Sequence, residues 1–174
     1  MSRDKKIKQA RLVETEGRHD RAWCHLLKAI YTDQAKYSVV IESANGGSPA
    51  EVVQAAINKQ KLVSGSFEHV VAIVDGDKTA AEIEEARVLS DKHNVELIIV
   101  TPCMEALLLN ILEPQKNWYN TAKGHKSYFQ RKYIRSDRRT AFIHYLKVFK
   151  PDSIEAASKS DPVLLHIIDV ISGK

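Results

Sequence analysis

Short apolar runs alternate with stretches of helical periodicity along the first part of the chain. The runs at 69–74 and 95–100 are nearly continuous in apolar residues, which is typical of strands covered by helices on both faces. Four strands are expected, at Gln9–Thr15, Tyr37–Ser43, His69–Val74 and Val95–Val100. Because a helical pattern follows each run, the sequence predicts an α/β fold with a mainly parallel, four-stranded sheet.

Helix-start signals mark the points where these strands end. Ser48–Glu51 and Thr79–Glu82 have the capping-box pattern, and Thr101-Pro102 precedes an apolar helix expected over 104–112. Ligands bind at the carboxyl ends of strands in open α/β sheets, so we expect the functional site there. Three loops fall at that edge: Glu16–Arg18, Asn45–Ser48 and Asp75–Lys78.

The character of the chain changes after Pro114. Residues 115–150 contain ten Lys or Arg residues against one acidic residue, Asp137, with eight aromatic residues interleaved. We therefore expect an α/β core over 1–113 and a basic, aromatic segment with C-terminal helices, packed on the core, over 114–174. Basic side chains that neutralise phosphates and rings that stack on bases favour a nucleic-acid partner. The expected contacts are Lys126, Arg131, Arg138 and Arg139, with His125 and Lys78 as further candidates.

The overall composition is consistent with that partner. The formal net charge is +4 and the pI is about 9.0, which suits a polyanion. Two cysteines, Cys24 and Cys103, are too few for a disulfide scaffold and favour a reducing cytoplasm. No stretch approaches the ~20 apolar residues of a membrane span, so we expect a cytoplasmic protein without membrane contact.

Three carboxylates are the strongest candidates for chemistry. Glu16 follows the first expected strand, and Asp75 and Asp77 follow the third on either side of Gly76. If these strands are neighbours, the acids converge, and hard oxygen ligands of this kind suit Mg²⁺ or Mn²⁺. Glu105, on the first turn of the fourth helix, is a candidate for a further ligand. Asp-Gly is also an ordinary turn dipeptide, which leaves a purely structural interpretation open.

These residues resemble a known family. A strand ending in Glu16-Gly17, a helix, and a strand ending in Asp75-x-Asp77 resemble the TOPRIM domain of primases, topoisomerases and several nucleases. The resemblance implies a Rossmann-like sandwich in which the glutamate is a general acid or base and the two aspartates bind magnesium. Three stretches are similar to the RloB-like group, regarded as nucleases of mobile defence systems: Glu16–Trp23, Gly46–Pro49 and Thr101–Leu109. Glu14 departs from the family pattern, so whether Glu14 or Glu16 is functional stays open.

The sequence therefore predicts a magnesium-dependent endonuclease or other phosphodiesterase that acts on DNA or RNA. One alternative is a non-catalytic or partner-dependent nucleic-acid-binding module, with an ATPase as a candidate partner. A lesser alternative is a phosphatase of the haloacid dehalogenase type, in which Asp75 would attack phosphorus and Asp77 would act as acid and base, because Asp75–Thr79 also has that motif. Assembly into a homo-oligomer stays open.

Overall fold

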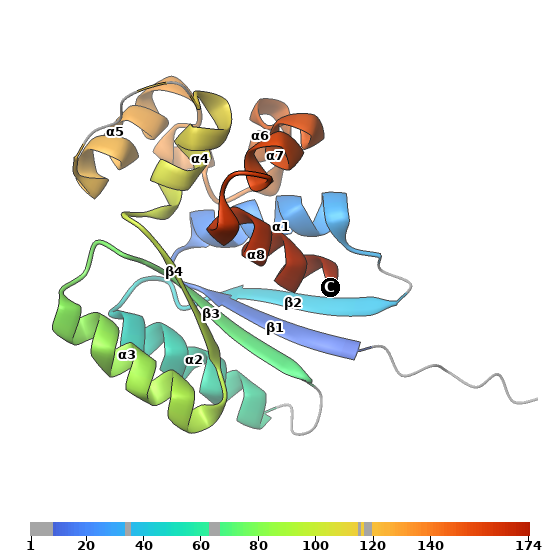
Figure 1. Ribbon diagram of the computed structural model, residues 1–174, viewed down its shortest axis with the longest axis vertical. Coiled ribbons are helices and arrows are strands. Elements are labelled where there is room, and N and C mark those ends of the chain that lie inside the picture. The colour runs from blue at the N-terminus through green and yellow to red at the C-terminus, as the bar shows by residue number, and fades with distance from the viewer. Residues whose placement is uncertain (1–8, 34–35, 63–66, 115, 117–119) are drawn as a thin grey trace, which may run out of the picture.

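The computed structural model describes residues 9–33, 36–62, 67–114, 116 and 120–174. Within those ranges the fold is α/β, with an all-parallel sheet of four strands and eight α-helices (Figure 1). The strands are β1 (Gln9–Thr15), β2 (Tyr37–Ser43), β3 (His69–Asp75) and β4 (Glu96–Val100). The helices are α1 (Arg18–Tyr31), α2 (Pro49–Leu62), α3 (Ala80–His93), α4 (Met104–Leu112), α5 (Ala122–Lys132), α6 (Phe142–Val148), α7 (Pro151–Ser158) and α8 (Pro162–Ser172), with a 3₁₀ turn, η1 (Ser136–Arg138), before α6.

The strands lie in the order β2-β1-β3-β4, and every neighbouring pair is parallel. The prediction of four strands in a parallel sheet is confirmed, and the strand bounds agree to within one residue. Both capping boxes also form: Glu51 accepts a hydrogen bond from Ser48 N at 2.6 Å, and Glu82 accepts one from Thr79 N at 2.9 Å. Local helix-start chemistry thus fixes where α2 and α3 begin.

Helices cover both faces of the sheet. Figure 1 shows α2 and α3 on one face and α1 and α8 on the other. Alternate side chains of each strand enter the two cores: Leu12 packs in the core that includes α2, whereas its neighbour Val13 packs in the core that includes α1 and α8. Burial on both faces explains why β3 is an almost unbroken apolar run.

The C-terminal helices share the core on the α1 face of the sheet. Helix α6 packs on α1, α7 on α4, and α8 on α1 and β4. Tyr145 and Phe149 are buried there beside Trp23, with ring centroids 6.3 and 4.8 Å from the Trp23 ring. Phe142 and Leu146 recur with them at helical spacing, but both side chains are exposed. Among the described helices, none is long and apolar enough to cross a membrane.

Candidate acidic site at the carboxyl edge of the sheet

The two acidic motifs meet because β1 and β3 are adjacent. Glu16 N donates a hydrogen bond to Ile73 O at 3.2 Å, which continues the β1–β3 pairing to the end of the strands. The Glu16 side chain then crosses to β3, where Oε2 accepts a hydrogen bond from Asp75 N at 3.2 Å. Asp77 lies two residues further along the loop. The structure therefore brings Glu16, Asp75 and Asp77 to one edge of the sheet.

Gly76 allows the loop between the two aspartates to lie against the end of β4. A Cβ atom at this position would come within 2.6 Å of Thr101 Oγ1 and 3.2 Å of the Thr101 Cα atom. The second of these contacts involves backbone, which cannot rotate away. Gly76 N also donates to Val100 O at 2.9 Å. A glycine is therefore required between Asp75 and Asp77 by close packing.

Two lysines neutralise these carboxylates. Lys126 Nζ, from α5, lies 2.8 Å from Asp75 Oδ2 and 3.0 Å from Asp77 Oδ2, so one ammonium group bridges both aspartates. Lys78 Nζ lies 3.1 Å from Glu16 Oε1. Burial lowers the pKa of Lys126, but the hydrogen bonds and charges of Asp75 and Asp77 outweigh it, and the pKa ends well above its usual value. Lys126 is therefore firmly charged.

Asp75 is the most constrained of the three acids. Its Oδ1 atom accepts a hydrogen bond from Met104 N at the start of α4, at 2.9 Å, while Oδ2 faces Lys126. Burial raises the pKa of Asp75 to about 6, although Lys126 and the Met104 amide both oppose that rise. Asp75, at the end of β3, is thus linked to the start of α4 and to Lys126 of α5.

The donor chemistry fits a hard divalent cation in part. Asp75 and Asp77 already direct oxygens at a single cation, the Lys126 ammonium, and carboxylate oxygens are the ligands that Mg²⁺ and Mn²⁺ prefer. Among the described residues, however, no three His, Cys, Asp or Glu side chains are arranged so that they could hold a metal ion together. A divalent ion on the two aspartates would have to displace Lys126 and complete its coordination with water or phosphate.

A buried ion pair lies behind the aspartates. Arg139, just before α6, pairs with Glu105 on the first turn of α4, and both side chains are almost fully buried. Glu105 Oε1 is also 3.9 Å from His19 Nε2. Burial, together with the positive charge of Arg139, lowers the pKa of His19 to about 4. At neutral pH, His19 is therefore an uncharged imidazole beside the acidic site.

Asp20 is a buried acid that the sequence analysis did not single out. Its Oδ2 atom accepts a hydrogen bond from Gly17 N at 2.9 Å. Burial and the nearby charges of Asp75 and Glu105 raise its pKa well above the usual range. The one signal in the sequence is its place three residues after Gly17, on the first turn of α1, where an acid is ordinarily a helix-capping group. The structure shows Asp20 in that capping role and also places it in the lining of the acidic site.

An open cleft of about 400 Å³ gives access to the acidic site. It runs between the start of α1, the loop after β2, and α5. The neutral histidine and the carboxylates therefore face solvent-accessible space large enough for part of a nucleotide. Its lining residues are Glu16, Gly17, Arg18, His19, Asp20, Asn45, Gly46, Asp75, Lys126 and Thr140.

Glu14 is separated from this cleft. Its side chain is fully buried on the α2 face of the sheet, where Lys59 Nζ lies 3.2 and 2.9 Å from its two oxygens. Burial raises the pKa of Glu14, and Lys59 counteracts part of that rise. Side chains two residues apart on a strand point to the same face, so Glu16 would lie on the face of Glu14 if β1 continued. Because β1 ends at Thr15, Glu16 is free of this alternation. Geometry therefore favours Glu16 as the functional glutamate.

Paired substitutions at these two glutamates provide a test. If the acidic site cleaves nucleic acid with a metal ion, as the sequence predicts, Glu16→Gln should lower the cleavage rate about a hundredfold or more, as for loss of a general acid or base. Glu14→Gln should leave the cleavage rate nearly unchanged, because Glu14 does not reach the cleft. Initial rates on one labelled oligonucleotide measure both effects. The reverse order of effects would transfer the assignment to Glu14.

The raised pKa of Asp75 predicts a pH-dependent stability difference. A carboxyl group whose folded-state pKa is about 6, against its ordinary 3.8, favours the folded state when protonated. That contribution is complete below about pH 3.8 and is lost as the pH rises through about 6. Relative to wild type, Asp75→Asn should therefore gain roughly 2 kcal/mol between about pH 4 and pH 7, measured by urea unfolding in chelator. A difference in free energy of unfolding that does not change with pH would show that Lys126 fully offsets the effect of burial on the pKa of Asp75.

The basic residues predicted to bind nucleic acid differ in how accessible they are. Arg131 and Arg138 are exposed and available for contact, and Lys126 lines the cleft while pairing with the aspartates. Arg139 and His125 are buried, each 4% exposed. His125 Nδ1 lies 2.8 Å from Thr121 O, within its own helix. Neither buried residue can contact a phosphate from its present position, because almost no part of either side chain is exposed. Lys78, the remaining candidate, pairs with Glu16.

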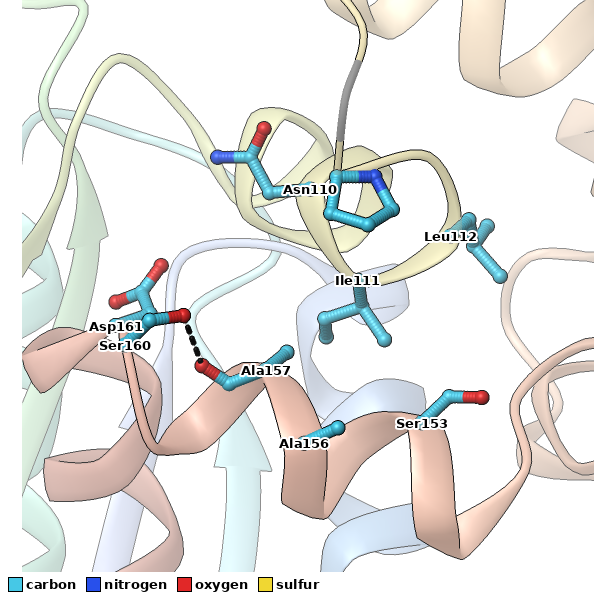
Figure 2. A pocket seen from close by; sticks show the side chains of 9 residues that line it. Asn110, Ile111, Leu112, Ser153, Ala156, Ala157, Ser160 and Asp161 are labelled. Carbon is cyan, nitrogen blue, oxygen red and sulfur yellow. Dashed lines mark hydrogen bonds between the residues drawn. The ribbon is translucent and has the colours of Figure 1, made fainter.

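A second pocket, of about 630 Å³, lies away from the acidic site between the end of α4 and α7. Figure 2 shows Ile111 of α4 next to Ala157 of α7 in its wall, with Ser160 hydrogen-bonded to the Ala157 carbonyl group at 3.1 Å. The Asp161 carboxylate in its wall caps α8 by accepting hydrogen bonds from Val163 N and Leu164 N, both at 3.0 Å. This pocket is larger than the cleft, but two of its polar side chains, Ser160 and Asp161, are engaged in local structure. The acidic site, with its cluster of carboxylates, is therefore the stronger candidate for a functional site.

Comparisons with protein-family models, with curated proteins and with solved structures find no significant match to this chain. The family resemblance therefore rests on the sequence motifs alone.

Proposed function

We propose that this protein is a divalent-metal-dependent nuclease with a TOPRIM-type domain, most similar to the RloB-like group. One observation carries the proposal: Asp75 and Asp77 direct oxygens at a single cation while Glu16, from the neighbouring strand, hydrogen-bonds to the backbone of Asp75. The parallel sheet supports it, because both acidic motifs follow strands that end at the same edge. That edge is where α/β proteins bind their ligands.

Each residue has a distinct role in this proposal. Asp75 and Asp77 would hold Mg²⁺ or Mn²⁺, which supplies Lewis-acid stabilisation of the charge that develops on a phosphodiester. Glu16 lines the cleft and would move a proton on the attacking water or the leaving oxygen. Lys126, once displaced from the aspartates, lies where it can bind a phosphate oxygen. Glu105 is too tightly paired with Arg139 to act as a ligand without rearrangement.

The exposed basic residues support nucleic acid as the substrate. Arg131 and Arg135 border a shallow, exposed pocket on α5, the helix that carries Lys126 into the acidic site. Arg138 lies exposed in η1, one residue before the buried Arg139. A polyanion bound along these residues would be guided toward the cleft, and its affinity would fall steeply with salt.

A non-catalytic or partner-dependent binding module is the second candidate. The arrangement of Lys78 and Lys126 favours it, because both lysines neutralise acids that a metal ion would otherwise require. A partner protein, for example an ATPase, could release Lys126 from the two aspartates by moving α5, which carries it. Haloacid-dehalogenase-type phosphatase chemistry gains no support, since it assigns no role to Glu16.

Incubation of the purified chain with labelled single- and double-stranded DNA and RNA tests the proposal. Each substrate is combined with Mg²⁺, Mn²⁺ or chelator, beside an Asp75→Asn control. Metal-dependent cleavage that is lost in the control would support the nuclease. Salt-sensitive binding without cleavage by the lone chain would favour the binding module instead.

A further inference from the structure

Helix α6 carries an uncovered apolar surface. Phe142, Ile143 and Leu146 are 42%, 46% and 47% exposed, and their spacing places them on one side of the helix. Tyr145, on the adjacent side of the helix, is buried. Six large hydrophobic side chains are exposed among the described residues, and three of them lie on this one short helix. Such a concentration marks a binding surface more often than scattered exposed residues do. We call Phe142, Ile143 and Leu146 the α6 patch.

Exposed basic residues flank the α6 patch along the chain. Residues 138–150 contain four basic residues and no acidic residue, and of the four only Arg139 is buried, in its pair with Glu105. Arg138, Lys147 and Lys150 are exposed. If a second copy of the chain docked face to face on this surface, it would bring like charges together, which disfavours association. The occupant that fits must combine negative charge with apolar surface.

The α6 patch lies close to the acidic cleft. Thr140 lines the cleft, and Phe142 follows it by only two residues. Because consecutive Cα atoms are 3.80 Å apart, the Cα atoms of Thr140 and Phe142 are at most about 7.6 Å apart. Helix α6 also packs on α1, whose first residues line the same cleft. A chain leaving the cleft past Thr140 would therefore meet the α6 patch.

We propose that the α6 patch binds unpaired bases of a single-stranded nucleic acid whose backbone passes through the acidic cleft. This inference rests on the proposed function and specifies its substrate class. A duplex presents phosphates and keeps its bases stacked inside, so exposed phenylalanine and leucine contribute little to its binding. An unpaired base offers an apolar face that stacks on Phe142, while Arg138, Lys147 and Lys150 neutralise the adjoining phosphates.

Fluorescence anisotropy measures the effect directly. A labelled single strand and a labelled blunt-ended duplex of equal length, each as DNA and as RNA, are titrated with the full chain in chelator so that no cleavage occurs. We expect Phe142→Ala/Leu146→Ala to weaken single-strand binding about tenfold and to leave duplex binding unchanged. The matched control is Leu165→Ala, which removes a side chain that is 45% exposed on α8 and should change neither affinity.

Three outcomes would overturn the inference. Single-strand affinity that is unchanged in the double variant removes the base contact, and a parallel loss of single-strand and duplex affinity indicates a general effect on folding or charge. Both leave nucleic-acid binding by the wild-type chain in place, so the proposed function survives them. Wild-type protein that binds none of the four probes would remove both proposals. Urea unfolding of the variants separates a folding defect from a lost contact.

Discussion

Replacing Asp77 with asparagine should abolish metal-dependent cleavage while leaving the fold intact. Asp77 is on an exposed loop, and its side-chain contact in the structure is the ion pair of Oδ2 with Lys126 at 3.0 Å. Little stability therefore depends on its charge. If Asp77 holds the metal, loss of the carboxylate removes several kcal/mol of transition-state stabilisation, which corresponds to about a thousandfold or more in rate. Single-turnover cleavage of a labelled substrate in Mg²⁺ gives the rate.

A matched control is Asp91→Asn, which removes an exposed aspartate from α3, outside the residues that line the cleft. This variant should retain full activity. Urea unfolding should place Asp77→Asn within about 0.5 kcal/mol of wild type, as for ordinary surface substitutions. Full activity in Asp77→Asn would remove its assigned role. Equal losses in both variants would point to general electrostatics instead of a specific site.

Replacing Arg139 with alanine should have the largest effect on stability. Arg139 pairs with Glu105, and both side chains are buried. Removing one partner of a buried ion pair leaves the other charge uncompensated, at a cost of about 3 kcal/mol or more. Here Glu105 would be left beside Asp20 and Asp75, whose pKa values are already raised. Urea unfolding at neutral pH measures the loss in free energy of unfolding.

The double variant Glu105→Gln/Arg139→Met is the control for that result. It removes both charges while keeping side chains of similar size, so we expect it to recover most of the lost stability. A double variant as unstable as Arg139→Ala would mean that the guanidinium group acts through another partner, for example the Phe129 ring, whose centroid lies 5.9 Å from its guanidinium carbon. An Arg139→Ala protein as stable as wild type would show that the pair contributes nothing.

The sheet could be predicted from the sequence because its determinants are local. The apolar runs of β3 and β4, the capping boxes of α2 and α3, and Gly17 after β1 each act within a few residues. Burial on both faces leaves a nearly continuous apolar pattern that needs no knowledge of the neighbouring strands. The order of the strands could not be predicted from the sequence. The convergence of Glu16 with Asp75 depends on that order, because it requires β1 and β3 to be neighbours.

The ion pairs of the site were not predictable in the same way. Lys126 and Asp75 are 51 positions apart and meet only because α5 folds back over the carboxyl edge of the sheet. From the sequence alone, a basic residue on a helix is easily interpreted as a phosphate contact, because the acidic residue that pairs with it in the fold is not known. Arg139 was predicted to be a surface contact for the same reason, although Glu105 holds it in the interior. Pairing with Lys59 likewise explains how Glu14 is tolerated in a buried strand.

The most direct test of the acidic centre is a Mn²⁺ titration of the nucleic-acid-free chain, followed by calorimetry or by the electron paramagnetic resonance signal of the ion. We expect saturable binding by wild type, loss of that binding in Asp77→Asn, and tighter binding in Lys126→Met, because the ammonium group no longer competes for Asp75 and Asp77. Identical weak binding by all three proteins would contradict a metal centre at these residues.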